Sequence, residues 1–264
     1  MSKLALLGGR YLLGLSIAQG GERVEVDVHG TRVEALDFGA YVVLSRHGHE
    51  GYVPPDKINH PANLGALREL GCSRVLAIGS VGSLRPELKV GTLVCPSDFI
   101  AFGSSPTTFG DERAHIVAEF DERWRKHVRR SWKEWGEADL HDGGVYWQSV
   151  GPRLETRAEI KLIANSADLV GMTLGSECTV ACELHMRYAA VCVVDNLANG
   201  IAAKRLTIER LEAGRAANEE LLGSELSAVV HPLADDVSSE DKVLDTPERL
   251  PKFHRDRAGA PPIG

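Results

Sequence analysis

The sequence lacks an excess of positive charge, since its 264 residues carry 30 Lys and Arg against 37 Asp and Glu, a formal net charge of −7 at pH 7. A nucleic acid or an anionic membrane surface is bound through a basic patch, so neither is expected as the main partner. A small anionic substrate stays compatible, because a basic pocket can lie within an acidic protein. Long apolar runs are absent too: none approaches the roughly 20 residues of a membrane-spanning helix.

Cysteine is scarce, and its five residues are scattered: Cys72, Cys95, Cys178, Cys182 and Cys192. An odd number of cysteines, mostly inside apolar runs, predicts reduced, buried thiols in a cytoplasmic protein rather than a disulfide framework. The first residues, MSKLALLGG, lack the cleavage pattern of a signal peptide and favour a first β-strand. Cys178 and Cys182 lie four residues apart, a spacing compatible with a metal pair. Because no His/Cys pair at zinc spacing accompanies them, core packing is favoured.

Apolar runs alternate with helix-compatible segments along most of the chain. Strands are expected in KLALLGG, in three short runs over residues 23–48, and in residues 73–84, 167–173 and 188–196. Helices are expected over about residues 61–70, 119–135, 156–164, 177–187 and 207–230. Wholly apolar strands alternating with helices predict an α/β fold around a buried central sheet. Residues 233–264 are charged, contain four prolines and have no period, which predicts a polar, mobile tail after a domain of residues 1–232.

Four loops that follow predicted strands collect residues suited to binding an anion. They are Gly8-Gly9-Arg10, Arg46-His47-Gly48-His49, Gly79-Ser80-Val81-Gly82-Ser83 and Gly171-Met172-Thr173. Together they offer a guanidinium group, imidazoles, hydroxyls and accessible backbone amides, which are the donors that bind phosphate. Arg46 can place two N–H groups on two phosphate oxygens. Taken one at a time, the same loops are compatible with ordinary turns, a solvated Arg-His surface, or a metal site at His47 and His49 that no carboxylate-histidine motif supports.

The order and spacing of these motifs resemble a known family. The stretch RHGH…PP.KIN..AN..ALRELGCSRVLAIGSVGSL, followed by GPRLETRAEI, DLVGMT and VVDN, is similar to the trimeric type of the purine nucleoside phosphorylase and methylthioadenosine phosphorylase family over roughly residues 4–230. The resemblance implies a single-domain, three-layer fold with a mixed central β-sheet flanked by helices. It also implies a pentosyltransferase that cleaves the N-glycosidic bond of a purine nucleoside with phosphate, needs no metal or organic cofactor, and forms homotrimers with active sites at the subunit interfaces.

The resemblance assigns the phosphate site to four residues. Arg46 and His47 match the phosphate-binding pair. Ser80 matches the residue whose backbone amide meets phosphate, and Thr173 matches the hydroxyl partner. His49 matches no such residue, and support of its own loop is the expected role.

The sugar and the neighbouring subunit are assigned in the same way. Met172 resembles the methionine that packs under the ribose, and Tyr146 a tyrosine near it. Phe109 and His115 lie in the segment that reaches into the adjacent subunit's site.

Two residues are expected to contact the base. Glu155 matches the glutamate that accepts from a ring N–H in enzymes for 6-oxopurines, and Asn196 matches their base-contacting asparagine. An amide can donate to O6 or N7 as negative charge develops on the departing base. Because Asp195 precedes Asn196, a shift of one residue in this match would put an acid in the base-contacting position. Glu155 taken alone is also compatible with a carboxylate at a helix N-terminus, although the base contact is favoured.

The chain departs from the family pattern at Arg10, where a serine or threonine hydroxyl normally touches phosphate, and at Thr207, where a histidine normally meets the 5′-hydroxyl. Arg10 either clamps the phosphate or fills its space. The leading prediction is phosphorolysis of a 6-oxopurine nucleoside, including a 5′-modified one such as methylthioinosine. The alternatives are S-methyl-5′-thioadenosine phosphorolysis, a phosphate-independent nucleoside hydrolase, and a non-catalytic nucleoside-binding relative.

Overall fold

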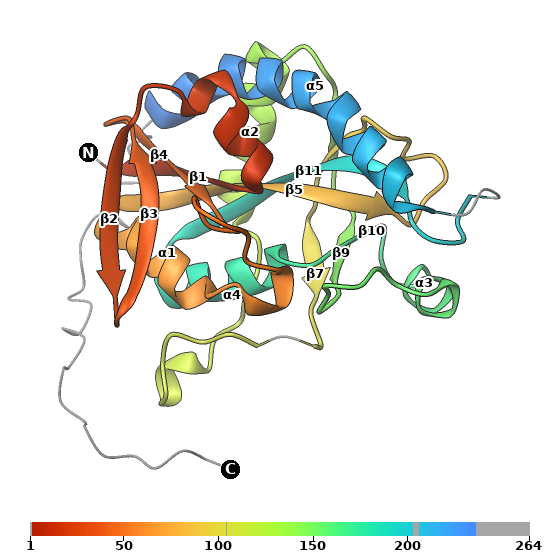
Figure 1. Cartoon of the computed structure of the whole chain (residues 1–264), viewed down its shortest axis with the longest axis horizontal. Coiled ribbons are helices and arrows are strands. Elements are labelled where there is room, and N and C mark those ends of the chain that lie inside the picture. The colour runs from red at the N-terminus through yellow and green to blue at the C-terminus, as the bar shows by residue number, and fades with distance from the viewer. Residues whose placement is uncertain (1, 104, 203–205, 236–264) are drawn as a thin grey trace.

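In the residues that a computed structural model describes, 2–103, 105–202 and 206–235, eleven strands form one sheet (Figure 1). The strands are β1 (Lys3–Gly8), β2 (Glu22–Val28), β3 (Thr31–Asp37), β4 (Tyr41–Ser45), β5 (Cys72–Ser83), β6 (Leu93–Cys95), β7 (Asp98–Ile100), β8 (Leu140–Asp142), β9 (Val145–Gln148), β10 (Leu169–Gly171) and β11 (Arg187–Leu197). The sheet is mixed, as predicted: β1 is parallel to β4 and β5, whereas β2, β3 and β4 are antiparallel neighbours.

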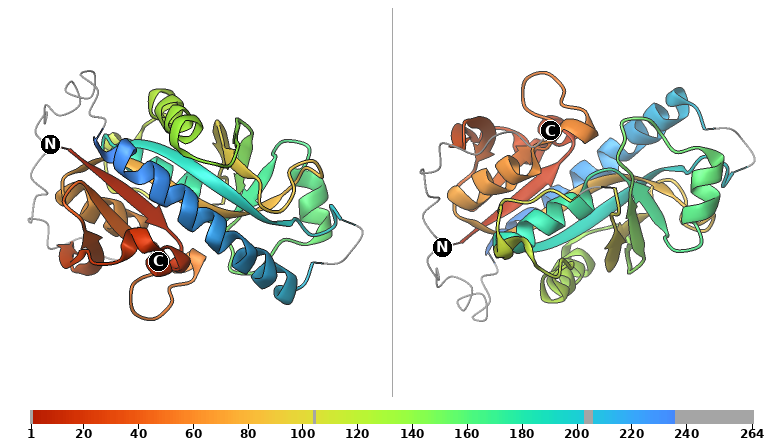
Figure 2. Two further views of the ribbon diagram at one scale, coloured as in Figure 1. Left: turned by 90° about the horizontal axis from the view of Figure 1, so that it is seen from above. Right: turned by 90° about the horizontal axis from the view of Figure 1, so that it is seen from below.

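Helices cover both faces of this sheet. They are α1 (His60–Glu69), α2 (Glu122–Trp135), α3 (Arg157–Ile163), α4 (Leu174–Glu183) and α5 (Ile208–Asp235), with short 3₁₀ turns η1 (Arg10–Gly14), η2 (Ser16–Ala18), η3 (Pro55–Lys57) and η4 (Glu112–Ala114). The long helix α5 crosses one face, and α1 and α4 lie on the other (Figure 2). The predicted three-layer arrangement is therefore confirmed.

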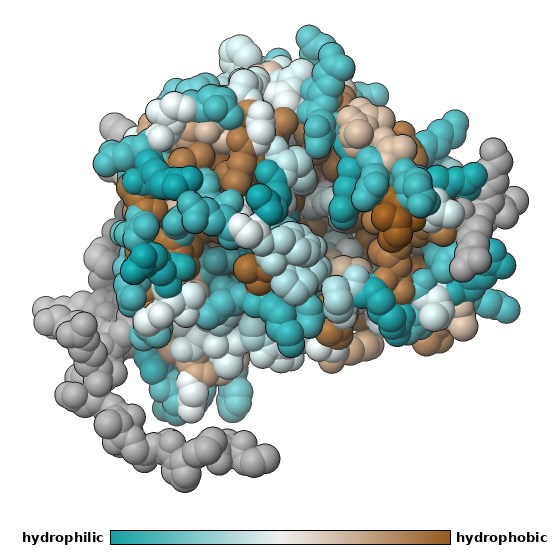
Figure 3. Space-filling view, in the orientation of Figure 1, coloured by the Kyte–Doolittle hydropathy of each residue, from teal (hydrophilic) through white to brown (hydrophobic). Residues whose placement is uncertain are grey.

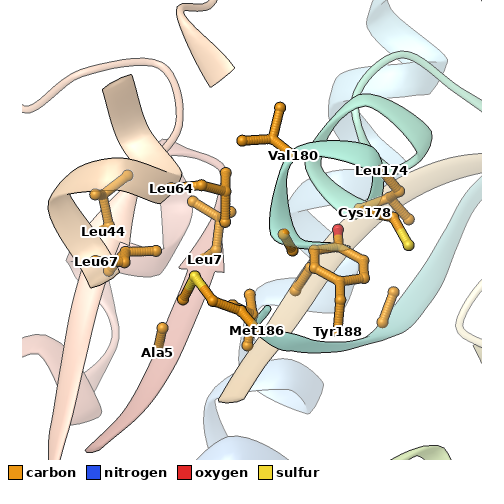
Figure 4. Close-up of a cluster of buried hydrophobic side chains, with 14 of the residues drawn as sticks. Ala5, Leu7, Leu44, Leu64, Leu67, Leu174, Cys178, Val180, Met186 and Tyr188 are labelled. Atoms are coloured by element: carbon orange, nitrogen blue, oxygen red, sulfur yellow. The ribbon is translucent and has the colours of Figure 1, made fainter. Parts of the chain in front are cut away.

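The two larger hydrophobic cores, one on each face of the sheet, follow from the alternation of side chains along the strands. In β1, Leu4 and Leu6 pack toward α2 and α5, whereas Ala5 and Leu7 pack toward α1 and α4. Figure 4 shows the core on the side of α1 and α4, where Leu7 lies near Leu64 of α1. All four β1 side chains are fully buried because successive residues of a strand point to opposite faces and both faces are covered.

Local signals set the helix ends. Asn59 accepts a hydrogen bond from the backbone N–H of Ala62 at 3.0 Å, and Pro61 stands in the first turn of α1. The chain leaves α1 through Gly71, whose φ of +87° suits glycine. Thr156 begins α3 with a capping box, in which its side chain and that of Glu159 each bond the other's backbone N–H.

The predicted boundary at residue 233 is wrong by three residues. Helix α5 continues through Pro232 to Asp235, and Leu233 and Ala234 are buried. Their carbonyl oxygens accept hydrogen bonds from the guanidinium of Arg74, at 3.1 and 3.3 Å. Apolar packing and these bonds hold the last turn on the domain. The rest of the predicted tail, 236–264, lies outside the described residues.

A break in the pairing of β5 positions the loops that carry chemistry. One edge of β5 pairs with β11 from Arg74 to Ser83. The other edge pairs with β1 up to Ala77 and with the antiparallel strand β10 from Gly82. Residues 78–81 therefore have no strand beside them on that edge in the described sheet. The carboxyl ends of the parallel strands β1 and β4 meet at the same place, which is where open α/β sheets bind ligands.

The surface carries no continuous apolar face in the view of Figure 3, where hydrophilic and hydrophobic residues are interspersed. Among the helices of the described residues, none combines the length and the low charge needed to cross a membrane.

Candidate active site

A cavity of about 290 Å³ opens at the break in β5. Loops after β1, β4 and β10, the ends of β5 and β11, and the first half of α5 line it. Most of the site residues predicted from the sequence are brought together here, namely Arg10, Arg46, His47, Ser80, Glu155, Met172, Thr173 and Asn196. The four loops selected from the sequence thus contribute to one site.

Arg46 lies beneath this cavity as a fixed, buried cation. Its Nε and Nη2 donate to the carboxylate of Glu177 at 2.5 and 3.1 Å, and its Nη1 and Nη2 donate to the carbonyl oxygens of Ile78 and Leu7 at 2.9 and 3.0 Å. Burial lowers the pKa of Arg46, but the nearby charge of Glu177 outweighs this and raises it. Four of the five guanidinium N–H groups are used, so the expected two-pronged contact with phosphate is wrong for this geometry. One N–H remains for a ligand.

His47 lines the cavity, and one of its two ring nitrogens is bonded to the protein. Its Nδ1 lies 2.7 Å from the carbonyl oxygen of Val53, and its ring stacks on Tyr52 with centroids 5.2 Å apart. Because a carbonyl only accepts, Nδ1 carries the proton, and Nε2 of the neutral ring is an acceptor. Burial lowers the pKa of His47 below 6.5, which favours this neutral form. The ring can therefore accept from a protonated phosphate oxygen.

Arg10 lines the cavity from η1 and is exposed. Its Nη1 donates to the carbonyl oxygen of Gly51, in the loop that follows His47. The side chain thus ties the first loop to the second and adds a positive charge to the cavity wall.

A bulge in β11 brings two successive polar residues to the cavity. Val194 pairs with Val81 and Asn196 with Gly82, so Asp195 is the extra residue. The carboxylate of Asp195 accepts from the Ser80 hydroxyl and, at 2.7 Å, from Asn218 Nδ2. Burial raises the pKa of Asp195. Both carboxylate oxygens of Asp195 are therefore already hydrogen-bonded within the protein.

Asn196 remains as the amide at the cavity wall. Its Nδ2 donates to the carbonyl oxygen of Leu197 at 2.9 Å, which leaves a second N–H of the amide. The Ser80 hydroxyl is occupied by Asp195, so only the backbone of Ser80 keeps its predicted role.

Two residues of the cavity lining carry unpaired oxygens. Glu155 Oε1 and Asn199 Oδ1 are buried without a hydrogen-bond partner in the described part of the chain, and both residues line the cavity. Asn199 Nδ2 donates to the backbone oxygen of Glu155 at 3.1 Å. An unpaired buried acceptor costs about 1–3 kcal/mol, so this pair indicates a ligand with N–H or O–H donors. Asn199 was missed from the sequence; its only signal was a polar residue in the loop after β11.

Tyr146, which was predicted to lie near the ribose, does not reach the cavity. It is 1% exposed and does not line the cavity. Its hydroxyl accepts from the backbone N–H of Thr173 at 3.1 Å. Tyr146 therefore supports the start of α4, whereas Thr173 itself reaches the cavity and makes no capping bond with its side chain.

Thr207 also lies outside the cavity. It accepts from the backbone N–H of Arg210 at the start of α5, at 3.4 Å, while the flanking Leu206 and Leu211 line the cavity instead. Thr207 therefore does not take part in the cavity lining, and two leucines of the same segment do.

Phe109 and His115 lie between β7 and α2, away from the cavity of their own chain. Phe109 lies under the guanidinium of Arg113, 4.3 Å from its ring centroid. The buried carboxylate of Glu183 holds this segment by accepting from Thr107 Oγ1 and the Thr108 N–H at 2.7 and 2.6 Å. The role of both residues in a neighbouring subunit stays a prediction.

Neither the pair His47 and His49 nor the pair Cys178 and Cys182, considered above as metal ligands, forms a metal site in the described residues. His49 Nε2 is buried without a partner in the described residues, and burial lowers the pKa of His49. Cys178 and Cys182 both direct their sulfur atoms to the carbonyl oxygen of Glu119, at 3.2 and 3.5 Å. Within the part of the chain that the structure covers, no group of three His, Cys, Asp or Glu residues is placed to hold a metal ion.

Two kinds of relatives are similar to this chain over most of its length. A probable 6-oxopurine nucleoside phosphorylase from Archaeoglobus fulgidus is 39% identical over 82% of this chain and 90% of its own length. A probable S-methyl-5′-thioinosine phosphorylase from Methanocaldococcus jannaschii is 39% identical over 79% of this chain and 84% of its own.

The fold has a solved counterpart. Methylthioadenosine phosphorylase from Schistosoma mansoni in complex with adenine superposes with a TM-score of 0.79 over 93% of this chain and 95% of that one, at 21% identity. Residues 14–231 match the family model described as the phosphorylase superfamily. The chain therefore belongs to the phosphorylase superfamily.

Proposed function

We propose that this protein catalyses phosphorolysis of the N-glycosidic bond of 6-oxopurine nucleosides. The observation that carries the proposal is the buried, unpaired Oε1 of Glu155, in a cavity that also contains the Asn196 amide. A 6-oxopurine offers a ring N–H donor and the acceptors O6 and N7, which complement a carboxylate and an amide donor. Adenine has a lone pair at the ring nitrogen where the 6-oxopurine has its N–H, and that lone pair would repel the carboxylate.

Two sets of cavity residues suit the two charges of the reaction. Arg10 supplies positive charge, Arg46 supplies an N–H donor, and His47 supplies an acceptor for the hydrogen of a protonated phosphate. As the bond between C1′ and N9 breaks, its electron pair moves onto the purine, where the Asn196 amide stabilises the negative charge. A phosphate oxygen forms the new bond to C1′, the proton that the phosphate loses is taken up by the purine anion, and the products are the free base and ribose 1-phosphate. Phosphate is the co-substrate, and the reaction uses no metal or organic cofactor.

The 5′ end favours an apolar substituent. In the segment where the family resemblance puts the 5′ contact, Leu206 and Leu211 line the cavity, whereas Thr207 accepts a hydrogen bond at the start of α5. We therefore propose that a 5′-methylthio nucleoside such as methylthioinosine is accepted, which agrees with the name of the Methanocaldococcus jannaschii relative.

We also propose that the protein works as a homotrimer. Phe109 and His115 stand on a segment that Glu183 fixes outside its own chain's cavity, so a neighbouring copy is where they would reach a nucleoside. Such an enzyme would serve purine salvage in the cytoplasm. The trimer is tested by light scattering, since a monomer in solution would contradict it.

The test of the reaction is a nucleoside panel of inosine, guanosine, methylthioinosine and methylthioadenosine, assayed with and without phosphate. The 6-oxopurine nucleosides should turn over only with phosphate. Glu155→Gln should lower kcat/KM for them by roughly 10- to 100-fold, because the carboxylate acceptor is lost.

Glu159→Gln is the matched control, because this exposed carboxylate caps α3 and pairs with Arg153 outside the cavity. It should leave the preference for the base unchanged. Turnover of methylthioadenosine alone, equal rates without phosphate, or binding without turnover would each favour one of the alternative functions.

A further inference from the structure

Tyr11 is a cavity residue that neither the sequence motifs nor the proposed mechanism uses. It follows Arg10 in η1, and its ring lies across Gly9, where an added Cβ would come within 3.0 Å of Cε1. The residue lines the cavity, yet its hydroxyl oxygen is buried and has no hydrogen-bond partner among the residues that the structure describes.

The surroundings of this hydroxyl define what it can bind. The charges of Arg46, Arg215 and Asp195 all act on it, and burial raises the pKa of Tyr11 well above its usual range. The hydroxyl therefore keeps its proton and is available as a donor. Asp195 is already engaged, because its two oxygens accept from Asn218 and Ser80.

The cations near Tyr11 favour an anionic acceptor. Arg215 reaches in from α5, with Nε 3.3 Å from Ser80 Oγ and 3.7 Å from Asp195 Oδ2, and the buried guanidinium of Arg46 lies below the cavity. An unpartnered buried hydroxyl is unfavourable for the free protein, and phenylalanine would fill the same space without it. A ligand oxygen that accepts from Tyr11 accounts for both its position and its lack of a partner.

We propose that the Tyr11 hydroxyl donates a hydrogen bond to the phosphate co-substrate. The proposal rests on the proposed function, which gives this cavity phosphate as its ligand. Arg10 occupies the place of the hydroxyl residue expected from the family resemblance, and its side chain is bonded to Gly51. Tyr11, one residue later, supplies the hydroxyl from the same turn.

The test uses Tyr11→Phe and inorganic phosphate as the probe. The rise in Tm with phosphate concentration gives the dissociation constant without any turnover, since a ligand of the native state stabilises it by mass action. The variant should bind phosphate roughly tenfold more weakly, which corresponds to about 1.4 kcal/mol. Its KM for phosphate should rise while the KM for inosine stays unchanged. Without phosphate, its Tm should equal or exceed that of the wild type, because the lost hydroxyl had no partner.

Tyr41→Phe is the matched control. The Tyr41 hydroxyl is buried and donates to the carbonyl oxygen of Ile17 at 3.0 Å, away from the cavity. This variant should lower the Tm and leave phosphate binding unchanged. An unchanged phosphate affinity in Tyr11→Phe overturns the proposal, as does a rise confined to the KM for inosine, which would place the hydroxyl on the sugar. If the wild type binds phosphate more tightly than Tyr11→Phe does but cleaves no nucleoside, the proposed function fails and the Tyr11 contact stands.

Discussion

Arg46 and Glu177 form an ion pair that solvent does not reach: Nε lies 2.5 Å from Oε1, and the two side chains are 4% and 0% exposed. The Tyr188 hydroxyl donates to the second carboxylate oxygen at 2.8 Å. The pair connects the end of β4 to α4 beneath the cavity. It fixes the Arg46 guanidinium beneath the cavity, and it does so without the substrate.

Glu177→Gln should strongly destabilise the protein, because it leaves the buried charge of Arg46 without its counter-charge. Breaking a buried pair in this way costs about 3–5 kcal/mol. The free energy of unfolding, measured by urea titration, tests this. Asp111→Asn removes an exposed partner of Arg113 and should change that free energy little. Equal effects of the two substitutions would contradict the structural role given to Glu177.

Arg10→Ser should raise the KM for phosphate by roughly 3- to 10-fold, because a cation at the cavity wall and its bond to the Gly51 carbonyl are both lost. Steady-state rates at varied phosphate measure this. Arg23→Ser is the comparison, since Arg23 is an exposed cation 3.6 Å from Glu50 of the same loop and does not line the cavity. Faster phosphate-dependent turnover in Arg10→Ser would mean that Arg10 fills the phosphate space.

His60 should make the protein less stable in acid. It is buried at the start of α1, and burial lowers its pKa from 6.5 to about 4. Between those values the unfolded chain holds a proton that the native state does not. The free energy of unfolding therefore falls as the pH drops from 6.5 to 4, by up to about 3 kcal/mol from this residue.

His60→Gln should flatten the pH dependence of stability in this window. Urea titrations at several pH values measure the slope for both proteins. His47 and His49 also have lowered pKa values because of burial, so the difference between wild type and variant isolates His60. Parallel curves would refute the assignment.

Local structure was predictable wherever neighbouring residues decide it. Asn59 caps α1, Gly71 ends it, and Thr156 begins α3, because each signal acts through the backbone within a few residues. The apolar strands likewise predicted a covered sheet. The boundary of α5 was misjudged because its last turn is held by Arg74, a residue about 160 positions away in the sequence.

In the site, too, local patterns predicted some features and contacts between distant residues decided the others. Motifs placed Arg46, His47, Glu155 and Asn196 at one cavity, because the loops after neighbouring strands converge there. Their chemistry depends on contacts that no local pattern contains.

The Arg46 guanidinium is fixed because Glu177, 131 residues away in the sequence, accepts hydrogen bonds from two of its N–H groups. The Tyr146 hydroxyl accepts from the backbone of Thr173 and does not face the cavity. Because of the bulge in β11, Asp195 bonds to protein groups and Asn196 remains at the cavity wall. The amino-acid pattern determined the fold class, the helix starts and the choice of loops, because these follow from local conformation and the period of apolar residues. Only the packing of distant segments decided which donors are used and which remain for a ligand.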